Sequence, residues 1–373
     1  MFSKHTTVLL VTDSSSYVLP IVRCLSSSRD LSIDILICSP ARPGPYRHSG
    51  YIRNLYWVKK MIGNDFPGTI THHIKKSGAD LVIPSGEIVA GLFIEYRKTI
   101  ENLAVMQPVP DKETLDLVIN KWKLNSWLRS EDFPSVNSVL LKELESGKMS
   151  TSTMKFPLLL KPLVGSGGKG IRLLQDQEAL ELTMEELADQ GSEYLIQEHI
   201  TGYDIDISFF AFNGEIIFYT IQRAVVSGGF TFAKGIEFIK NEDFLELAGE
   251  ILTKLNYTGI AHLDFRYDEL LKKYILLDFN LRYWSTLEGS ESVGVNFPLL
   301  IAAYCLESTT DRPDYRLGYF FSTKAAFRTV LQNLGKREKL PVKFRYTQLY
   351  YSIRDPRPEI FGFMENLKQK WWR

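Results

Sequence analysis

The chain has 373 residues, and 44 lysine and arginine residues balance 44 aspartate and glutamate residues. The length allows two or three units with hydrophobic cores, and 45% hydrophobic residues is ordinary for a soluble globular protein. A net charge of zero gives no general attraction to nucleic acid or anionic membranes. We therefore expect no nucleic acid partner, while a homodimer stays open.

The cysteines and the apolar runs indicate the cellular compartment in which the protein is expected. Cys24, Cys38 and Cys305 are scattered and odd in number, so they indicate neither a disulfide framework nor a zinc-binding pair. We expect no signal peptide and no integral membrane segment, because no apolar run approaches 18 uncharged residues. Together these features predict a cytoplasmic protein.

Strand and helix signals alternate at the start of the chain. Short β-branched apolar runs predict strands over residues 6–12, 33–38 and 80–84, with helices over 17–28 and near 67–77. Such alternation is typical of a parallel sheet with helical crossovers. We predict a Rossmann-like α/β domain over residues 1–112. Its first loop, Asp13 to Ser16, has no glycine, so a dinucleotide is not expected there.

A second architecture follows a helical pattern over residues 111–130. Apolar β-rich runs predict strands over residues 158–162, 171–174, 194–198, 206–212, 215–222, 260–266 and 273–278, with helices near 176–190 and 241–255. Asn213-Gly214 between two of these runs predicts a tight hairpin. We expect a largely antiparallel α+β core, divided into residues 113–200 and 201–305. Residues 306–373 are predicted to form a C-terminal extension packed on that core.

The segment from Lys161 to Gly170 is rich in glycine. Gly165, Gly167 and Gly170 match the spacing of a dinucleotide fingerprint, but residues 171–174 predict a strand where that fingerprint needs a helix. A Walker A loop also fails, because Gly170 follows Lys169. What remains is a glycine-rich loop between two antiparallel strands. Its backbone N–H groups can bind phosphate oxygens, although an ordinary flexible hairpin is the alternative.

Polar side chains stand at the ends of two later strands. Asp264 ends one, while Asp278 and Asn280 end the next and point to the same side because they are two residues apart. Three oxygen ligands on one face suit Mg²⁺, which prefers carboxylates together with substrate phosphates. Arg282 follows on the same side and is suited to stabilising a phosphoryl group. The alternative is a set of polar residues at a turn.

In order along the chain, these segments resemble the ATP-grasp superfamily over roughly residues 111–305. In this resemblance residues 197–200 are the hinge, Gly202 and Asp204 follow it, and Lys121 precedes the core strands. The similarity extends to proteins related to the large chain of carbamoyl-phosphate synthase and to carboxylate–amine ligases. It implies a preceding α/β domain and two subdomains that clamp ATP.

The resemblance also implies roles for individual residues. The α- and β-phosphates would contact Lys121 and Lys161. The loop residues Gly165, Ser166, Gly167, Gly168 and Gly170 would close over the β- and γ-phosphates. The adenine would be held by Gln197, Glu198, His199 and Ile200, and the ribose by Asp204. One or two Mg²⁺ ions, with Mn²⁺ possible, would be bound by Asp264, Asp278 and Asn280. Arg282 and Lys161 would act in catalysis.

The implied function is an ATP- and Mg²⁺-dependent ligase that activates a small carboxylate as an acyl phosphate for attack by an amine. Family members usually have glutamate where Asp204 and Asp278 stand, and proline where Leu281 stands. A nucleotide-binding module with little turnover, or a small-molecule kinase, therefore remains an alternative. His199, His262 and Arg223 are further candidates near the site, and Arg223 fits either a substrate carboxylate or a surface ion pair.

Overall fold

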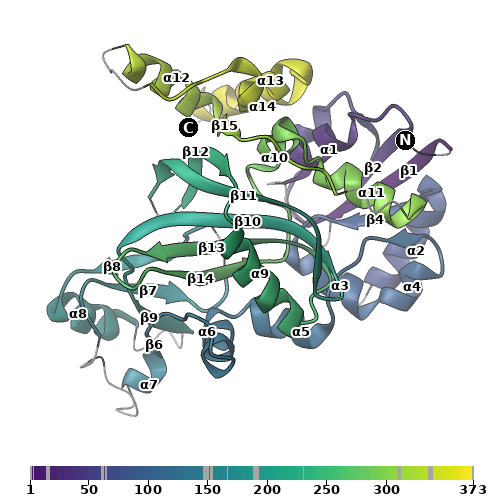
Figure 1. The fold of residues 1–373 in the computed structure, drawn as a ribbon. Coiled ribbons are helices and arrows are strands. Elements are labelled where there is room, and N and C mark those ends of the chain that lie inside the picture. Colours follow the sequence, from purple (N-terminus) through teal and green to yellow (C-terminus); the bar gives the residue numbers. More distant parts are fainter. Residues whose placement is uncertain are drawn as a thin grey trace.

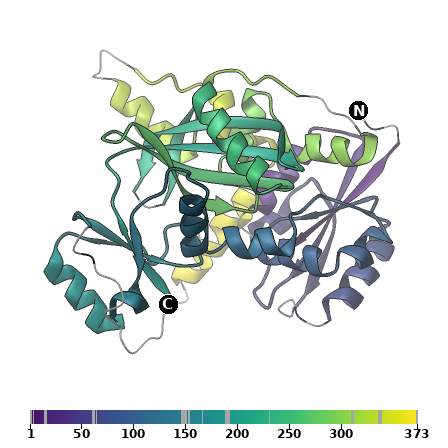
Figure 2. The same cartoon turned by 60° about the horizontal axis from the view of Figure 1, so that its bottom comes forward.

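A computed structural model describes residues 2–371, except residues 3, 14–16, 60–62, 64, 146–150, 152–153, 166, 188–192, 230, 309–311 and 335–338. The described residues form three sheets. In Figures 1 and 2 the N-terminal sheet and a small sheet lie on opposite sides of a long, curved central sheet. The C-terminal helices lie beside the central and N-terminal sheets (Figure 1).

The N-terminal sheet is parallel, as predicted. Its strands are β1 (Thr6–Thr12), β2 (Leu31–Cys38), β3 (Ile52–Val58), β4 (Leu81–Pro84) and β5 (Val105–Met106), in the order β3-β2-β1-β4-β5. The helices of this part are α1 (Val18–Leu25), α2 (Phe66–Ser77), α3 (Glu87–Glu95) and α4 (Arg97–Glu101), with the 3-10 turn η1 (Pro45–His48). Sequence reasoning missed β3. This edge strand is half exposed, and its Arg53 and Asn54 bind the fully buried Asp34 of β2.

The small sheet is antiparallel and carries the glycine-rich loop. Its strands are β6 (Ser138–Leu140), β7 (Leu158–Pro162), β8 (Arg172–Leu174) and β9 (Tyr194–Glu198), in the order β6-β9-β7-β8. The helices α7 (Leu141–Glu145) and α8 (Gln177–Leu187) supply apolar side chains to its core. The loop joins β7 to β8, which pair antiparallel as the sequence predicted.

The central sheet has six strands in the order β14-β13-β10-β11-β12-β15. They are β10 (Gly202–Phe212), β11 (Glu215–Gly228), β12 (Thr231–Ile239), β13 (Gly259–Asp268), β14 (Lys273–Asn280) and β15 (Gly318–Phe321). Helices α5 (Lys112–Val118), α6 (Lys121–Ser130) and α9 (Glu242–Lys254) share a hydrophobic core with it. Asn213 and Gly214 have φ of 49° and 81°, as the predicted tight hairpin requires.

The remaining elements are α10 (Leu287–Val293), α11 (Phe297–Glu307), α12 (Thr323–Asn333), η2 (Phe344–Tyr346), α13 (Gln348–Arg354) and α14 (Arg357–Trp371). Residues 306–373 were predicted to form a C-terminal extension packed on the core, and β15 of this stretch pairs with β12 at the edge of the central sheet. The chain after it contacts the N-terminal part, where Arg23 of α1 forms an ion pair with Glu359 of α14. Arg23 also forms an ion pair with Glu288 of α10, which precedes β15. Within the described residues, the helices lack the length and apolarity needed to cross a membrane.

Candidate functional site

Two rows of polar residues cross one face of the central sheet. Directly opposed residues of antiparallel strands point to the same face, so the strand register defines each row. The first row, from β11 through β10 and β13 to β14, is Gln222, Asp206, Asp264 and Asp278. The second row, in the same strand order, is Thr220, Ser208, His262 and Asn280. The pairing of β13 with β14 thus brings Asp264, Asp278 and Asn280 together, as the sequence suggested.

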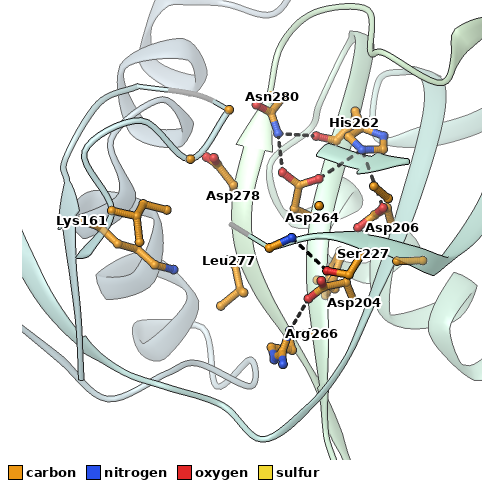
Figure 3. Close-up of a pocket in the computed structure, with 18 of the residues that line it drawn as sticks. Lys161, Asp204, Asp206, Ser227, His262, Asp264, Arg266, Leu277, Asp278 and Asn280 are labelled. Carbon is orange, nitrogen blue, oxygen red and sulfur yellow. Dashed lines mark hydrogen bonds and ion pairs between the residues drawn. The ribbon is translucent and has the colours of Figure 1, made fainter. Parts of the chain in front are cut away.

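A cavity of about 410 Å³ lies over the first row, and residues of the small sheet line its other side. Figure 3 shows Lys161 across the cavity from Asp264, His262 and Asp206. Lining residues come from the small sheet, the glycine-rich loop, β10, β11, β13 and the chain that follows β14. The cavity therefore lies between two sheets, where a ligand can touch both.

Asp264 and Asn280 are joined by a hydrogen bond. The Asn280 amide nitrogen donates to Asp264 at 2.9 Å, and the Asn280 amide oxygen accepts from Arg282 at 2.7 Å. Burial, followed by the nearby charge of Asp264, raises the pKa of Asp278 even though Lys121 opposes this. Two partly exposed carboxylates thus face each other with incomplete charge compensation, which suits a divalent cation.

Lys121 and Lys161 reach the cavity from different elements. Lys121 is the first residue of α6, and its ammonium group lies 3.2 Å from Asp278 and 2.9 Å from the carbonyl oxygen of Gly165. Lys161 of β7 is almost fully buried and donates to the Gln197 side chain at 2.5 Å. Burial lowers the pKa of Lys161 to about 8, although the charge of Asp278 acts in the opposite direction.

The glycine-rich loop borders the cavity only in part. Gly167 and Gly168 line it, with φ of 70° and 74°, in the left-handed region that favours glycine. Gly165 contributes its carbonyl oxygen to Lys121, and Gly170 packs against Pro162. Ser166 lies outside the described residues.

The predicted hinge lines the cavity with Gln197, Glu198, His199, Ile200 and Asp204. Arg266 of β13 links its parts: the guanidinium donates to the carbonyl oxygens of Ile200 at 2.7 Å and Gly202 at 2.9 Å, and forms an ion pair with Asp204. No motif in the sequence pointed to Arg266. Its role depends on the pairing of β10 with β13, which places it directly opposite Asp204.

Two further candidates have different surroundings. His262 lines the cavity, and its ring nitrogens lie 2.8 Å from the Ser208 hydroxyl and 3.1 Å from Asp264. Burial acts in the opposite direction, but the hydrogen bond and the negative charge of Asp264 raise the pKa of His262. Arg223 forms an ion pair with Glu237 at 2.6 Å. Of the two predictions for Arg223, the ion pair is the one observed.

The N-terminal part also reaches the site. Glu87, at the start of α3, lies 3.4 Å from the Arg282 guanidinium, which stacks 4.7 Å from the Tyr17 ring centre. Burial raises the pKa of Glu87, although Arg282 opposes this shift. Sequence reasoning missed this contact because nothing in a single segment shows which domains touch.

The part of the chain that forms this site matches a known domain. Residues 118–286 match the family model of the ATP-grasp domain. The chain carries an ATP-grasp domain. The resemblance inferred from the motifs is thus confirmed.

The chain spans about half the length of the curated relatives that it matches. The chain is 27% identical over 214 residues to a formate-dependent phosphoribosylglycinamide formyltransferase of Prochlorococcus marinus (strain MIT 9515), covering 53% of this chain and 52% of that one. It is 22% identical over 240 residues to a D-aspartate ligase of Enterococcus faecium (strain Aus0004), covering 57% of each chain.

Solved structures match over more of the chain. The N5-carboxyaminoimidazole synthetase from Staphylococcus aureus has a TM-score of 0.66 at 12% identity, with 91% of both chains covered. An L-amino acid ligase from Bacillus licheniformis has a TM-score of 0.62 at 15% identity, with 86% of this chain and 80% of that one covered. At these identities the likeness extends to the fold, which includes the parallel N-terminal sheet together with the ATP-grasp domain.

Proposed function

We propose that the protein is an ATP- and Mg²⁺-dependent ligase that activates a small-molecule carboxylate as an acyl phosphate and joins it to an amine. The observation that carries this proposal is the meeting of Asp264, Asp278 and Asn280 with Lys121 and Lys161 around one cavity. Relatives named as a D-aspartate ligase and a formyltransferase support it. We also propose that residues 113–200 and 201–305 form two subdomains that clamp ATP, after an N-terminal domain over residues 1–112.

The residues present fit a divalent cation. Asp264 and Asp278 stand opposite each other on paired strands, and the Asn280 amide lies beside Asp264. Asp264, Asp278 and Asn280 would hold Mg²⁺, which would balance the negative charge of the ATP phosphates when bound.

The nucleotide would extend from the hinge to the acidic residues. Gln197 to Ile200 would hold the adenine, and Asp204, fixed by Arg266, would accept hydrogen bonds from the ribose. Lys121 and Lys161 would contact the α- and β-phosphates, with Gly165 to Gly170 over the β- and γ-phosphates. Lys121 already joins the loop carbonyl of Gly165 to Asp278, which supports a coupling between the loop and the acidic residues.

The reaction has two steps. An oxygen of the substrate carboxylate attacks the γ-phosphorus, the bond to the β-phosphate oxygen breaks, and ADP leaves. The amine nitrogen then attacks the acyl carbon, the carbon–oxygen bond to phosphate breaks, and inorganic phosphate and a proton are released. Arg282 would stabilise the charge on the transferred phosphoryl group. The protein's main contributions are position and charge compensation.

An activation assay tests this function. The purified chain is incubated with Mg²⁺, ATP and one carboxylate from a panel that includes the common amino acids, with hydroxylamine as a small nucleophile. Formation of a hydroxamate together with ADP supports acyl phosphate chemistry. A product that retains the phosphoryl group on a hydroxyl would instead identify a kinase. ATP binding without ADP release across the panel would favour a nucleotide-binding module.

A further inference from the structure

The polar row over the cavity continues beyond the residues proposed to bind the metal. Gln222 of β11 donates from its side-chain amide to Asp206 of β10 at 3.2 Å, and its amide oxygen accepts from the Thr286 hydroxyl at 2.9 Å. All three residues line the cavity. The ionised Asp206 carboxylate can only accept, so the Gln222 amide nitrogen faces it and the amide oxygen faces the Thr286 hydroxyl. These three side chains are thus held together by hydrogen bonds at this corner of the cavity.

The Asp206 carboxylate is buried without a close cation. Only 9% of the residue is exposed. Among the described residues, its recorded polar partners are the neutral Gln222 amide and the His262 ring nitrogen at 4.0 Å, and that nitrogen is closer to Asp264, at 3.1 Å. A buried carboxylate is costly unless a positive charge compensates it. The cavity that it faces is where such a charge can enter.

The arginines of the neighbouring strands have other partners. Arg266 binds Asp204, Arg223 binds Glu237, and Arg282 binds Asn280 and Glu87. These three arginines are therefore engaged elsewhere, and a cationic ligand in the cavity can supply charge to Asp206. Ala224, Gly228, Gly229 and Ala233 line the same side of the cavity, and their small size leaves room for it.

The position of this corner indicates which ligand it receives. Lys161 lies across the cavity from Asp264 and Asp206 (Figure 3), so the nucleotide phosphates would lie between the lysines and Asp264. Asp206 lies on the next strand, farther from β14, and Thr286 follows Arg282 in the chain. With the nucleotide placed as proposed above, this corner would lie beside the γ-phosphate and outside the path of the nucleotide.

We infer that Asp206, with Gln222 and Thr286, forms the binding site for the ammonium group of the amine acceptor. This inference rests on the ligase function proposed above and narrows its acceptor to small molecules that carry a primary ammonium group. The Gln222 amide holds the Asp206 carboxylate in place, and the carboxylate binds the ammonium form and accepts one of its protons. The neutral amine nitrogen then has the lone pair with which it attacks the acyl carbon, and the second proton leaves as the amide forms. An uncharged nucleophile would have no ionic attraction to Asp206, so the loss of this carboxylate should affect its binding little.

The test compares acceptors in the same protein. The carboxylate is first identified by hydroxamate formation in the wild type, and hydroxylamine, which is uncharged at neutral pH, is then replaced by a panel of primary amines. For Asp206→Asn, we expect the KM for the ammonium acceptor to rise at least about tenfold while the KM for ATP changes much less. We also compare kcat/KM of the variant with that of wild type for each nucleophile. The fold-loss with the ammonium acceptor should be at least about ten times the fold-loss with hydroxylamine.

Asp116→Asn is the matched control, because it makes the same change on the exposed surface of α5. Thermal unfolding checks that both variants fold. Equal losses with both nucleophiles, or an unchanged KM for the amine, would overturn the inference. A rise in the Mg²⁺ concentration needed for half-maximal rate, with the amine KM unchanged, would instead make Asp206 a metal ligand. Absence of hydroxamate from the wild type would contradict the ligase function itself.

Discussion

The Lys121 ammonium group lies 3.2 Å from the Asp278 carboxylate and 2.9 Å from the Gly165 carbonyl oxygen. A single side chain at the start of α6 therefore joins the acidic end of β14 to the glycine-rich loop. Movement of the glycine-rich loop and binding of a cation at the acidic residues are expected to be coupled, because both change the partners of Lys121.

Asp278→Ala should abolish Mg²⁺-dependent ATP turnover and leave the fold intact. The carboxylate is half-buried and its pKa is raised, so its removal relieves a partly desolvated charge even as it removes a proposed metal ligand. We expect a loss of at least about 100-fold in kcat, measured as ADP release over a range of Mg²⁺ concentrations. Turnover that matched wild type, with an unchanged melting temperature, would disprove the metal assignment.

Lys161 should make ATP binding dependent on pH. Burial lowers its pKa to about 8, so the cation proposed to contact phosphate is lost as the pH rises through that value. The affinity for Mg-ATP, measured by calorimetry from pH 7 to pH 9.5, should therefore weaken above about pH 8. Lys161→Met should weaken binding at least about tenfold at pH 7 and flatten this dependence.

The exposed Lys123 of the same helix as Lys121 provides the control, since Lys123→Met should leave both the affinity and its pH dependence unchanged. Stability should respond in the opposite sense to binding. Between about 8 and 10.5 the unfolded chain holds a proton on Lys161 that the folded protein has lost. Its contribution to the free energy of unfolding should therefore rise with pH across this range, and Lys161→Met should remove that rise.

Much of the fold could be predicted because the strands carry local signals. The runs at 6–12, 158–162 and 194–198 match β1, β7 and β9 at both ends. The strands that were missed are β3, β5, β6, β12 and β15. Of these, β3 is half exposed, and β12 contains Gly235 against the Phe321 ring. Local periodicity does not report such packing.

The site was predicted where residues cluster in the sequence and missed where they cluster only in space. Asp278 and Asn280 share one strand end, so their proximity could be read directly. Asp206, Gln222 and Glu87 are on three separate elements, and only the register of β10 with β11 and the packing of the N-terminal domain bring them to the cavity. A resemblance to a family identifies only the residues that match the family's motifs, so it did not identify these three.

Gly202→Ala should destabilise the protein much more than Gly165→Ala. Both glycines have positive φ, 154° and 139°, so each substitution strains the backbone. A Cβ on Gly202 would lie only 1.8 Å from the Tyr267 carbonyl oxygen, whereas nothing lies within 4 Å of one on Gly165. We expect losses in the free energy of unfolding of about 3 kcal/mol or more for the first and about 1–2 kcal/mol for the second, measured by urea denaturation. Similar losses for both would contradict the role of the clash.

Arg23→Met should destabilise the contact between the N-terminal part and the C-terminal chain, and more so at pH 8 than at pH 5. Arg23 is 6% exposed and lies 3.1 Å from the buried Glu288 carboxylate, while donating to the Asp355 carbonyl oxygen at 3.3 Å. Removing one member of a buried pair costs about 3–5 kcal/mol, because the other charge is left without compensation.

The pH dependence follows from Glu288, whose pKa burial raises to about 7 despite the opposing charge of Arg23. In the folded protein the Glu288 carboxyl group keeps its proton up to about pH 7, whereas in the unfolded chain the group loses the proton near pH 4.5. Its contribution to stability is therefore present at low pH and is lost as the pH rises through 7. Without Arg23 the cost of ionisation grows, so the difference between Arg23→Met and wild type should widen from pH 5 to pH 8 in denaturation curves. Adding Glu288→Gln to Arg23→Met should recover part of the stability at pH 8 and narrow the pH-dependent difference from wild type. If the double variant keeps the pH profile of Arg23→Met, a group other than Glu288 controls the pH dependence of stability.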